Sequence, residues 1–330
     1  MSHPNPIPHA HTASSVRRTV LHPTHAYNYA TRLLSSMAVG SAYGAQLTGL
    51  PAAHPRLLSA CPVRVDADPA AHHVVMPGQF GATTMVALVT LEAVACSVAL
   101  GESEVSPRQL SQSLEEWLAL DDTRGLGQQA TIAVQCVGAA LVAGLYGAFR
   151  PLADAEAIPT TVAHILGAQL SRVDAADLRA VTRMVRAMLL EPAAEDATLL
   201  RERCKVLATL IETGEVQLAA RTLPDEPVMR AVVQGAIGAH MQSRSMNIDA
   251  SVKAVVNLGG DTEAAMTAFG FIVGSLPLRY PQQLADRWPH IRQQSRWMDL
   301  DEPERLYVDH IAVDMFTASL LRTKDRWMLN

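Results

Sequence analysis

Apolar side chains recur along most of the chain at intervals of three and four residues, which is the spacing of one face of an α-helix. Convincing two-residue alternation of the kind that predicts a β-strand is absent, and so is an internal repeat. A small-residue apolar segment over 27–45 precedes the clearest helical patterns. Those patterns cover residues 85–100, 107–120, 130–149, 159–170, 174–190, 195–221, 226–243, 249–256 and 261–275. Two or three further helices are expected within 281–322, so we predict an all-α fold, a single bundle of roughly a dozen helices.

Local signals place several helix starts. Ser106-Pro107 should open a helix, because serine caps helices, proline suits the first turn and Gln109 stands at the capping-box position. Asp249 is predicted to cap a short helix that ends near Val256. Asp261 follows two glycines and precedes an apolar run, so it also occupies an N-cap position. The proline-containing segment 47–75 and the Asp- and Gly-containing segment 121–127 are predicted loops.

The first 26 residues differ from the rest of the chain. They contain five histidines, four prolines and no acidic residue, a composition typical of a solvated arm. The histidines are irregularly spaced, so metal capture by this arm is the weaker interpretation, and docking to a partner stays open. We therefore predict a flexible arm over 1–26 and one all-helical domain over 27–330.

Bulk composition excludes several classes of protein. A formal net charge of −5 gives no general reason to bind nucleic acid, whose phosphates demand a basic surface. The four cysteines form no CxxC pair, and Cys96 and Cys136 are predicted to be buried thiols. The uncharged stretch 130–149 is long enough to span a bilayer, but its Ala and Gly content, Gln135 and the absence of flanking basic clusters favour a buried core helix. No membrane association and a cytoplasmic location are expected.

Three short stretches, in order along the chain, resemble one family. Residues 255–275 read VVNLGGDTEAAMTAFGFIVGS, which resembles the VNLGGDTDTIAAIAGAIAGA-like stretch of ADP-ribosylhydrolases. Residues 80–92, FGATTMVALVTLE, resemble FTDDTxMALALAE, and residues 40–47, GSAYGAQL, resemble GxAxGDAL. Weaker matches lie at 124–127, 138–145 and 278–288. The resemblance implies a compact ADP-ribosylhydrolase-like helical bundle.

Most of the positions that hold the two Mg²⁺ ions of this family carry other residues here. Ala82 and Thr83 replace an Asp-Asp pair, Ala45 replaces another acid and Ala264 replaces a hydroxyl ligand. Of the core carboxylates, Asp261 and Glu263 remain as candidate metal ligands, with Glu263 one methylene longer than the family's Asp. Mg²⁺ demands near-octahedral oxygen ligation. We therefore expect no resident cofactor, or at most one weakly bound Mg²⁺.

Two alternatives stay open for these acids. A dinuclear site would need carboxylates recruited from elsewhere, such as Asp121 or Asp122. Alternatively, Asp261 and Glu263 are present for helix geometry alone, because an N-cap acid and a first-turn acid both stabilise the start of a helix.

The preferred prediction is a catalytically impaired relative that acts by binding. Its partner would be an ADP-ribose-like ligand, or a protein that is ADP-ribosylated or ADP-ribosylating, which suggests immunity or regulation. Thr83, Thr84 and Gly260 are the predicted ligand-binding residues, and no catalytic residue is assigned. The alternative is an active Mg²⁺-dependent hydrolase that removes ADP-ribose, with Asp261 and Glu263 on the metal. A purely structural role is the third hypothesis.

Overall fold

Helices account for all of the regular structure in the described part of the chain. The computed structural model describes residues 23–45, 47–49, 52–53, 79–102, 104–119, 126, 129–149, 154–190, 195–245, 247–275 and 306–311. Its helices are α1 (Pro23–Ala45), α3 (Ala82–Ala99), α4 (Pro107–Ala119), α5 (Gln129–Gln135), α6 (Val137–Phe149), α7 (Ile158–Ile165), α8 (Arg172–Leu190), α9 (Glu195–Glu212), α10 (Val216–Thr222), α11 (Pro227–Ser245), α12 (Ile248–Val256) and α13 (Thr262–Ser275). Residues 306–311 are also helical. The all-α prediction is confirmed.

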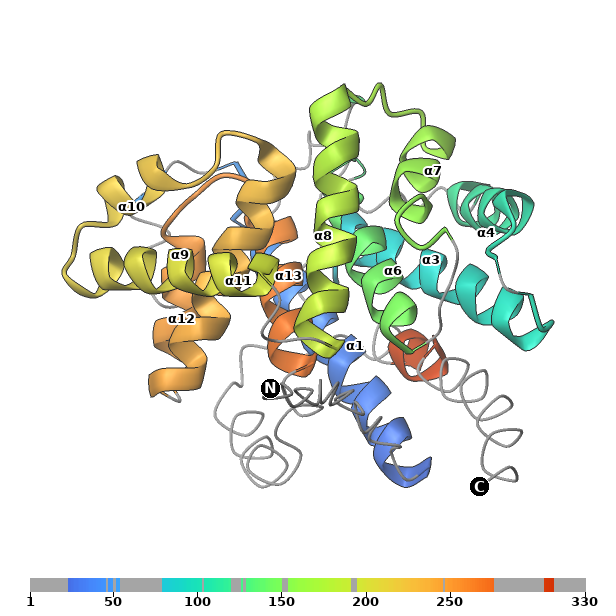
Figure 1. Ribbon diagram of the computed structural model, residues 1–330, viewed down its shortest axis with the longest axis horizontal. Helices are drawn as coiled ribbons and strands as arrows, with labels where there is room; N and C mark the ends of the chain where they lie inside the picture. Colours follow the sequence, from blue (N-terminus) through green and yellow to red (C-terminus); the bar gives the residue numbers. More distant parts are fainter. Residues whose placement is uncertain are drawn as a thin grey trace, which may run out of the picture.

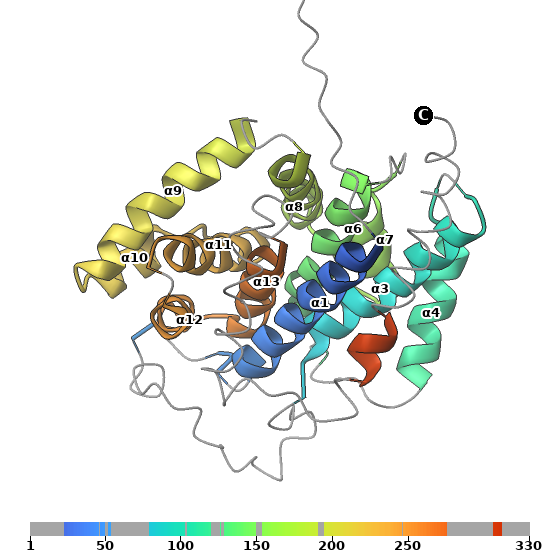
Figure 2. The same ribbon diagram turned by 90° about the horizontal axis from the view of Figure 1, so that it is seen from below.

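Two groups of helices build the core and meet along α13. In one group α13 packs between α1 and α11, and in the other α6 packs between α3 and α8. Helix α13 also contacts α3 and α6, which joins the two groups (Figure 1). Viewed from below, α9, α10 and α12 surround one side of this core, while α4 and α7 lie on the other (Figure 2). The buried apolar side chains form one continuous cluster across both groups.

Helices α1 and α13 approach each other through glycines spaced four residues apart. A Cβ added at Gly40 on α1 would lie 2.2 Å from the carbonyl oxygen of Met266. On the facing helix, a Cβ at Gly270 would lie 2.1 Å from the carbonyl oxygen of Ser36. Gly44 and Gly274 continue the same contact toward the two ends of the crossing. These glycines, which lie in the family-like stretches, therefore allow the backbones of α1 and α13 to come into direct contact.

The predicted helix starts are only partly right. Helix α4 begins at Pro107 as predicted, but the Gln109 side chain accepts a hydrogen bond from the Ser97 hydroxyl on α3 and so tethers two helices. Helix α12 begins at Ile248, because Asn247 caps it by accepting the Ala250 N–H at 3.1 Å. The prediction that Asp249 is the cap is wrong, since Asp249 lies inside the first turn.

Other helix boundaries differ from the predicted ones. The stretch predicted as one helix over 195–221 is divided into α9 and α10 at Gly214, whose φ is +84°. The predicted core helix over 130–149 is observed as α5 and α6, with a turn at Cys136 between them. Helix α1 starts at Pro23, before the predicted domain boundary at Tyr27. The arm prediction otherwise falls on residues 1–22, which lie outside the described residues.

Of the two cysteines predicted to be buried, one is buried and one is exposed. Cys136 is buried, as expected, but Cys96 is exposed near the end of α3, where Ala99 and Leu100 also reach the surface. Within the described ranges, α3 is the one helix long and apolar enough to cross a membrane by length and composition. In this fold, 83% of it is buried inside the bundle. Core helices of soluble proteins share these properties.

Candidate functional site

The three family-like stretches meet at one place in the fold. The second half of α1, the start of α3 and the start of α13 come together there, as Figure 2 shows for the three helices. Residues more than two hundred positions apart are in direct contact, since the Thr262 hydroxyl donates to the carbonyl oxygen of Gly44 at 2.7 Å. We call this place the junction, and its central side chain is Glu263.

Glu263 points from α13 into the start of α3. Its side chain is buried, with 6% of the residue's surface exposed. Its Oε1 accepts the Thr83 N–H at 2.7 Å and the Ser41 hydroxyl at 3.3 Å. The Ser41 Oγ in turn accepts the Gly81 N–H at 2.9 Å. Helix α3 has no side-chain cap of its own at Gly81, so α1 and α13 supply acceptors for two of its first N–H groups.

Gly81 leaves the space that the Glu263 carboxyl group fills. A Cβ at this position would lie 2.5 Å from Cδ of Glu263 and 2.6 Å from each carboxyl oxygen. The family motif that this stretch resembles has threonine at this position. The absence of a side chain at Gly81 and the length of the Glu263 side chain fit each other here, because the carboxyl group occupies the volume beside the glycine.

The first N–H groups of α13 also find hydrogen-bond acceptors within the protein. Asp261 caps its own helix, because its Oδ1 accepts the Ala264 N–H at 3.0 Å, which confirms the N-cap prediction. The next donor, the N–H of Glu263, is accepted by the Thr48 hydroxyl at 3.0 Å. In the same short segment, 47–49, the Gly49 N–H donates to the Gly260 carbonyl oxygen at 2.9 Å. Residues 47–49 are therefore hydrogen-bonded to the turn that leads into α13 and to its first residues.

Burial dominates the electrostatics of the two acids. Burial, and to a lesser extent the negative charge of nearby Asp261, raise the pKa of Glu263 to about 8, against the opposing hydrogen bonds from Thr83 and Ser41. Burial also raises the pKa of Asp261, while the N–H groups of Ala264 and Glu263 oppose that rise. Both carboxyl groups therefore hold protons more tightly than exposed acids do.

The predicted ligand-binding residues lie at the junction, where Thr83 and Thr84 are inside its packing and Gly260 is half-buried. Thr83 and Thr84 are both fully buried, and the Thr84 hydroxyl lies 3.4 Å from that of Thr267. Gly260 has a φ of +78°, a backbone conformation that favours glycine. Ligand contact at these positions stays a prediction. Asp121 and Asp122, the acids that a second metal would recruit, lie outside the described residues.

Sequence reasoning missed three contributors to the junction. Ser41 and Thr48 supply hydroxyl groups, and Gly81 supplies space. The one signal for them was the departure from the family pattern at Gly81, next to a lengthened acid at 263. Across the part of the chain that the structure describes, no group of three or more His, Cys, Asp or Glu side chains is placed to hold a metal ion.

Comparison with known proteins supports the fold. A solved structure described as an "ADP-ribosylglycohydrolase-related protein complex" is similar to this chain, with a TM-score of 0.52 and 17% sequence identity over 90% of this chain and 99% of the other. No protein-family profile matches the sequence, and no curated protein matches it. The chain thus has the all-α fold of an ADP-ribosylglycohydrolase-related protein, a likeness that concerns the fold alone at this identity.

Proposed function

We propose that this protein is a non-catalytic relative of ADP-ribosylhydrolases that acts by binding. Its partner is an ADP-ribose-like ligand, or a protein that carries or transfers ADP-ribose. One observation carries the proposal. The carboxyl group of Glu263, one of the two acids left from the family's metal set, is enclosed against Gly81 and accepts hydrogen bonds from Thr83 and Ser41.

Ligand chemistry supports this proposal. A Mg²⁺ ion needs several oxygen atoms in near-octahedral geometry and keeps much of its water. Oε1 of Glu263 already accepts two donors, and Oδ1 of Asp261 accepts the Ala264 N–H. Ala82 and Thr83 offer no carboxylate at the positions where the family has its Asp-Asp pair. The residues present therefore do not fit a pair of Mg²⁺ ions, and we derive no hydrolytic step through them.

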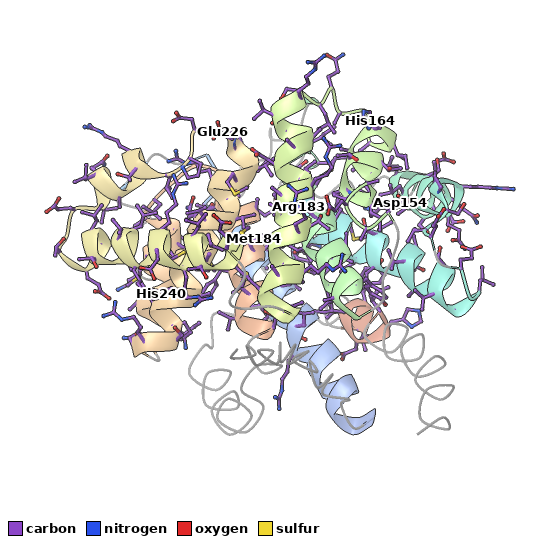
Figure 3. The ribbon with its side chains drawn as sticks, in the orientation of Figure 1. Asp154, His164, Arg183, Met184, Glu226 and His240 are labelled. Carbon is purple, nitrogen blue, oxygen red and sulfur yellow. The ribbon has the colours of Figure 1, made fainter. Side chains whose placement is uncertain are left out.

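The first test is binding of Mg²⁺ and ADP-ribose by calorimetry, together with thermal unfolding in Mg²⁺. We expect a melting temperature that does not change with Mg²⁺, and ADP-ribose binding that does not depend on the ion. Any ligand that binds the native state must stabilise it. Stabilisation by Mg²⁺ that disappears in Asp261→Ala but persists in Asp154→Ala would refute the proposal. Asp154, labelled in Figure 3, is an exposed acid in the turn before α7 and is not one of the residues of the junction.

An active hydrolase is the second candidate, and one observation favours it. Asp261 and Glu263 are close enough for the charge of one to raise the pKa of the other, and paired carboxyl groups with separated pKa values are common in glycosidic chemistry. The assay is Mg²⁺-dependent release of ADP-ribose from an ADP-ribosylated arginine substrate. Turnover that is lost in Glu263→Gln would establish this alternative. Absence of both turnover and ligand binding would leave the structural role.

A further inference from the structure

Helix α9 is attached to the rest of the fold by a narrow face. Among the α9 residues whose side chains the structure describes, Cys204, Leu207 and Ala208 are the buried ones. The helix lies at the edge of the molecule and packs mainly against α11 (Figure 2). An element held by few buried side chains opens at a lower free energy than the core does. The polar groups between α9 and α11 therefore affect how firmly α9 is held.

His240 of α11 lies beside α9, as Figure 3 shows, and one of its ring nitrogens is enclosed. The residue is half-buried, but its Nε2 atom is shielded from water and has no hydrogen-bond partner within the protein. A neutral imidazole tolerates such a place, because one of its two nitrogens carries no proton. An imidazolium carries a proton on both nitrogens, so its Nε2 becomes a buried donor without an acceptor.

Charged groups on both helices surround the ring. Arg244 of α11 pairs with Glu212 of α9 at 3.4 Å. Lys205 pairs with Glu202 at 2.5 Å, both on α9. In the described part of the chain, these four groups are the charges that act on the titration of His240. Burial first, and the two cations second, lower the pKa of His240 below its ordinary 6.5, while the two acids oppose them. The surroundings therefore disfavour the imidazolium, in agreement with the enclosed Nε2.

We propose that His240 is a pH-sensitive switch in the contact between α9 and α11, and that its protonation in mild acid opens α9 and exposes the buried face of that helix. The packed state binds a proton at His240 less tightly than the open state does. Acidification below the ordinary pKa of histidine therefore favours the open state. The inference goes beyond the proposed function and does not depend on it, because none of these residues belongs to the junction.

The thiol of Cys204 reports the opening of α9. Burial raises the pKa of this thiol to about 12, so it reacts when α9 leaves α11 and not before. The full-length protein is treated with a dithiodipyridine reagent from about pH 7.5 to about pH 5, and peptide mass spectrometry measures the modification rate of each cysteine. As the pH falls, we expect the rate at Cys204 to rise about tenfold relative to that in His240→Gln. Glutamine does not titrate, so the ratio of the two rates isolates the effect of His240.

Two matched variants separate the switch from general effects of acid. His164→Gln removes an exposed histidine of α7, whose Nδ1 lies 2.6 Å from the Thr160 carbonyl oxygen, and should keep the wild-type response. Lys205→Gln removes one of the two cations beside His240. The imidazolium is then less unfavourable in the packed state, so the acceleration at Cys204 in acid should be smaller.

Clear outcomes would overturn the proposal. One is an equal pH profile at Cys204 in wild type and His240→Gln. Another is parallel exposure of Cys136, which is buried in the turn between α5 and α6, because the whole fold would then open rather than α9. If His240→Gln does not fold, the comparison of wild type with Lys205→Gln decides, and an equal acceleration in the two counts against the switch. Mg²⁺ and ADP-ribose take no part in this experiment, so failure here would leave the proposed function intact.

Discussion

Gly81→Ala tests the central contact of the junction with a single methyl group. The backbone at Gly81 has φ −89° and ψ −169°, which alanine adopts without strain. Any cost must therefore come from the new Cβ, which would lie 2.5–2.6 Å from the carboxyl atoms of Glu263. Carbon atoms pack at about 3.5–4 Å, so the carboxyl group has to move by roughly 1 Å. The 2.7 Å hydrogen bond from the Thr83 N–H cannot survive such a shift.

The expected cost follows from two contributions. A buried N–H group left without its acceptor costs about 1–3 kcal/mol, and overpacking of a dense core costs about 1–3 kcal/mol. These two costs overlap, because the movement of the Glu263 carboxyl group that relieves the overpacking also breaks the hydrogen bond. We therefore expect Gly81→Ala to lower the unfolding free energy by about 3 kcal/mol. The measurement is urea unfolding followed by circular dichroism, with the slope against urea unchanged.

A double-mutant cycle isolates the contact from other effects of the substitution. In a Glu263→Ala background the clashing group is absent, so Gly81→Ala should cost less than about 0.5 kcal/mol. The coupling between the two positions should therefore be about 3 kcal/mol, with the double variant more stable than the sum of the single variants predicts. An equal cost of Gly81→Ala in both backgrounds would refute the reasoning, and so would a negligible cost in wild type.

Three further predictions concern pH, helix crossing and helix capping. The raised pKa of Glu263, about 8 against an ordinary 4.5, means that the folded state binds its proton more tightly than the unfolded state, so the unfolding free energy should fall as pH rises between these values. Urea midpoints across this range should fall less steeply in Glu263→Gln, and an unchanged pH profile would contradict the assignment. Gly40→Ala should cost about 3 kcal/mol or more by urea unfolding, because its Cβ would meet the Met266 backbone. Gly147→Ala, whose Cβ would lie 3.2 Å from that of Ala155, should change stability far less, and equal effects would count against the close crossing. Asn247→Ala should cost about 1 kcal/mol through loss of the α12 cap, and an unchanged melting temperature would show that this cap contributes nothing.

Local chemistry predicts some of this fold correctly and some of it wrongly. Helices α4 and α13 start where the sequence predicts, at Pro107 and just after Asp261. A proline and an acid suit these positions whatever the helix packs against. Asn247 and Asp249 can both cap a helix, and the choice between them depends on tertiary packing. The helix begins at Ile248, whose side chain is buried, and Asn247 directly before it is the cap.

The site was predictable in its parts and not in its arrangement. The family-like stretches indicated which segments meet, and helix geometry predicted the role of Asp261. The sequence could not show that Glu263 points into α3, because that contact spans 180 positions and depends on how α13 packs. Likewise, the apolar neighbours of Cys96 suggested burial, whereas the end of α3 emerges at the surface.

The close crossing of α1 and α13 affects the order in which the protein can fold during synthesis. Their contacts join segments more than two hundred residues apart, as Gly44 and Thr262 illustrate. The ribosome therefore releases α1 long before its main partner exists, and the buried face of α1 stays exposed to water in the meantime. Contacts of this range also slow folding. A nascent chain stalled before α13 should present that apolar face, with its row of glycines, to chaperones rather than to its own core.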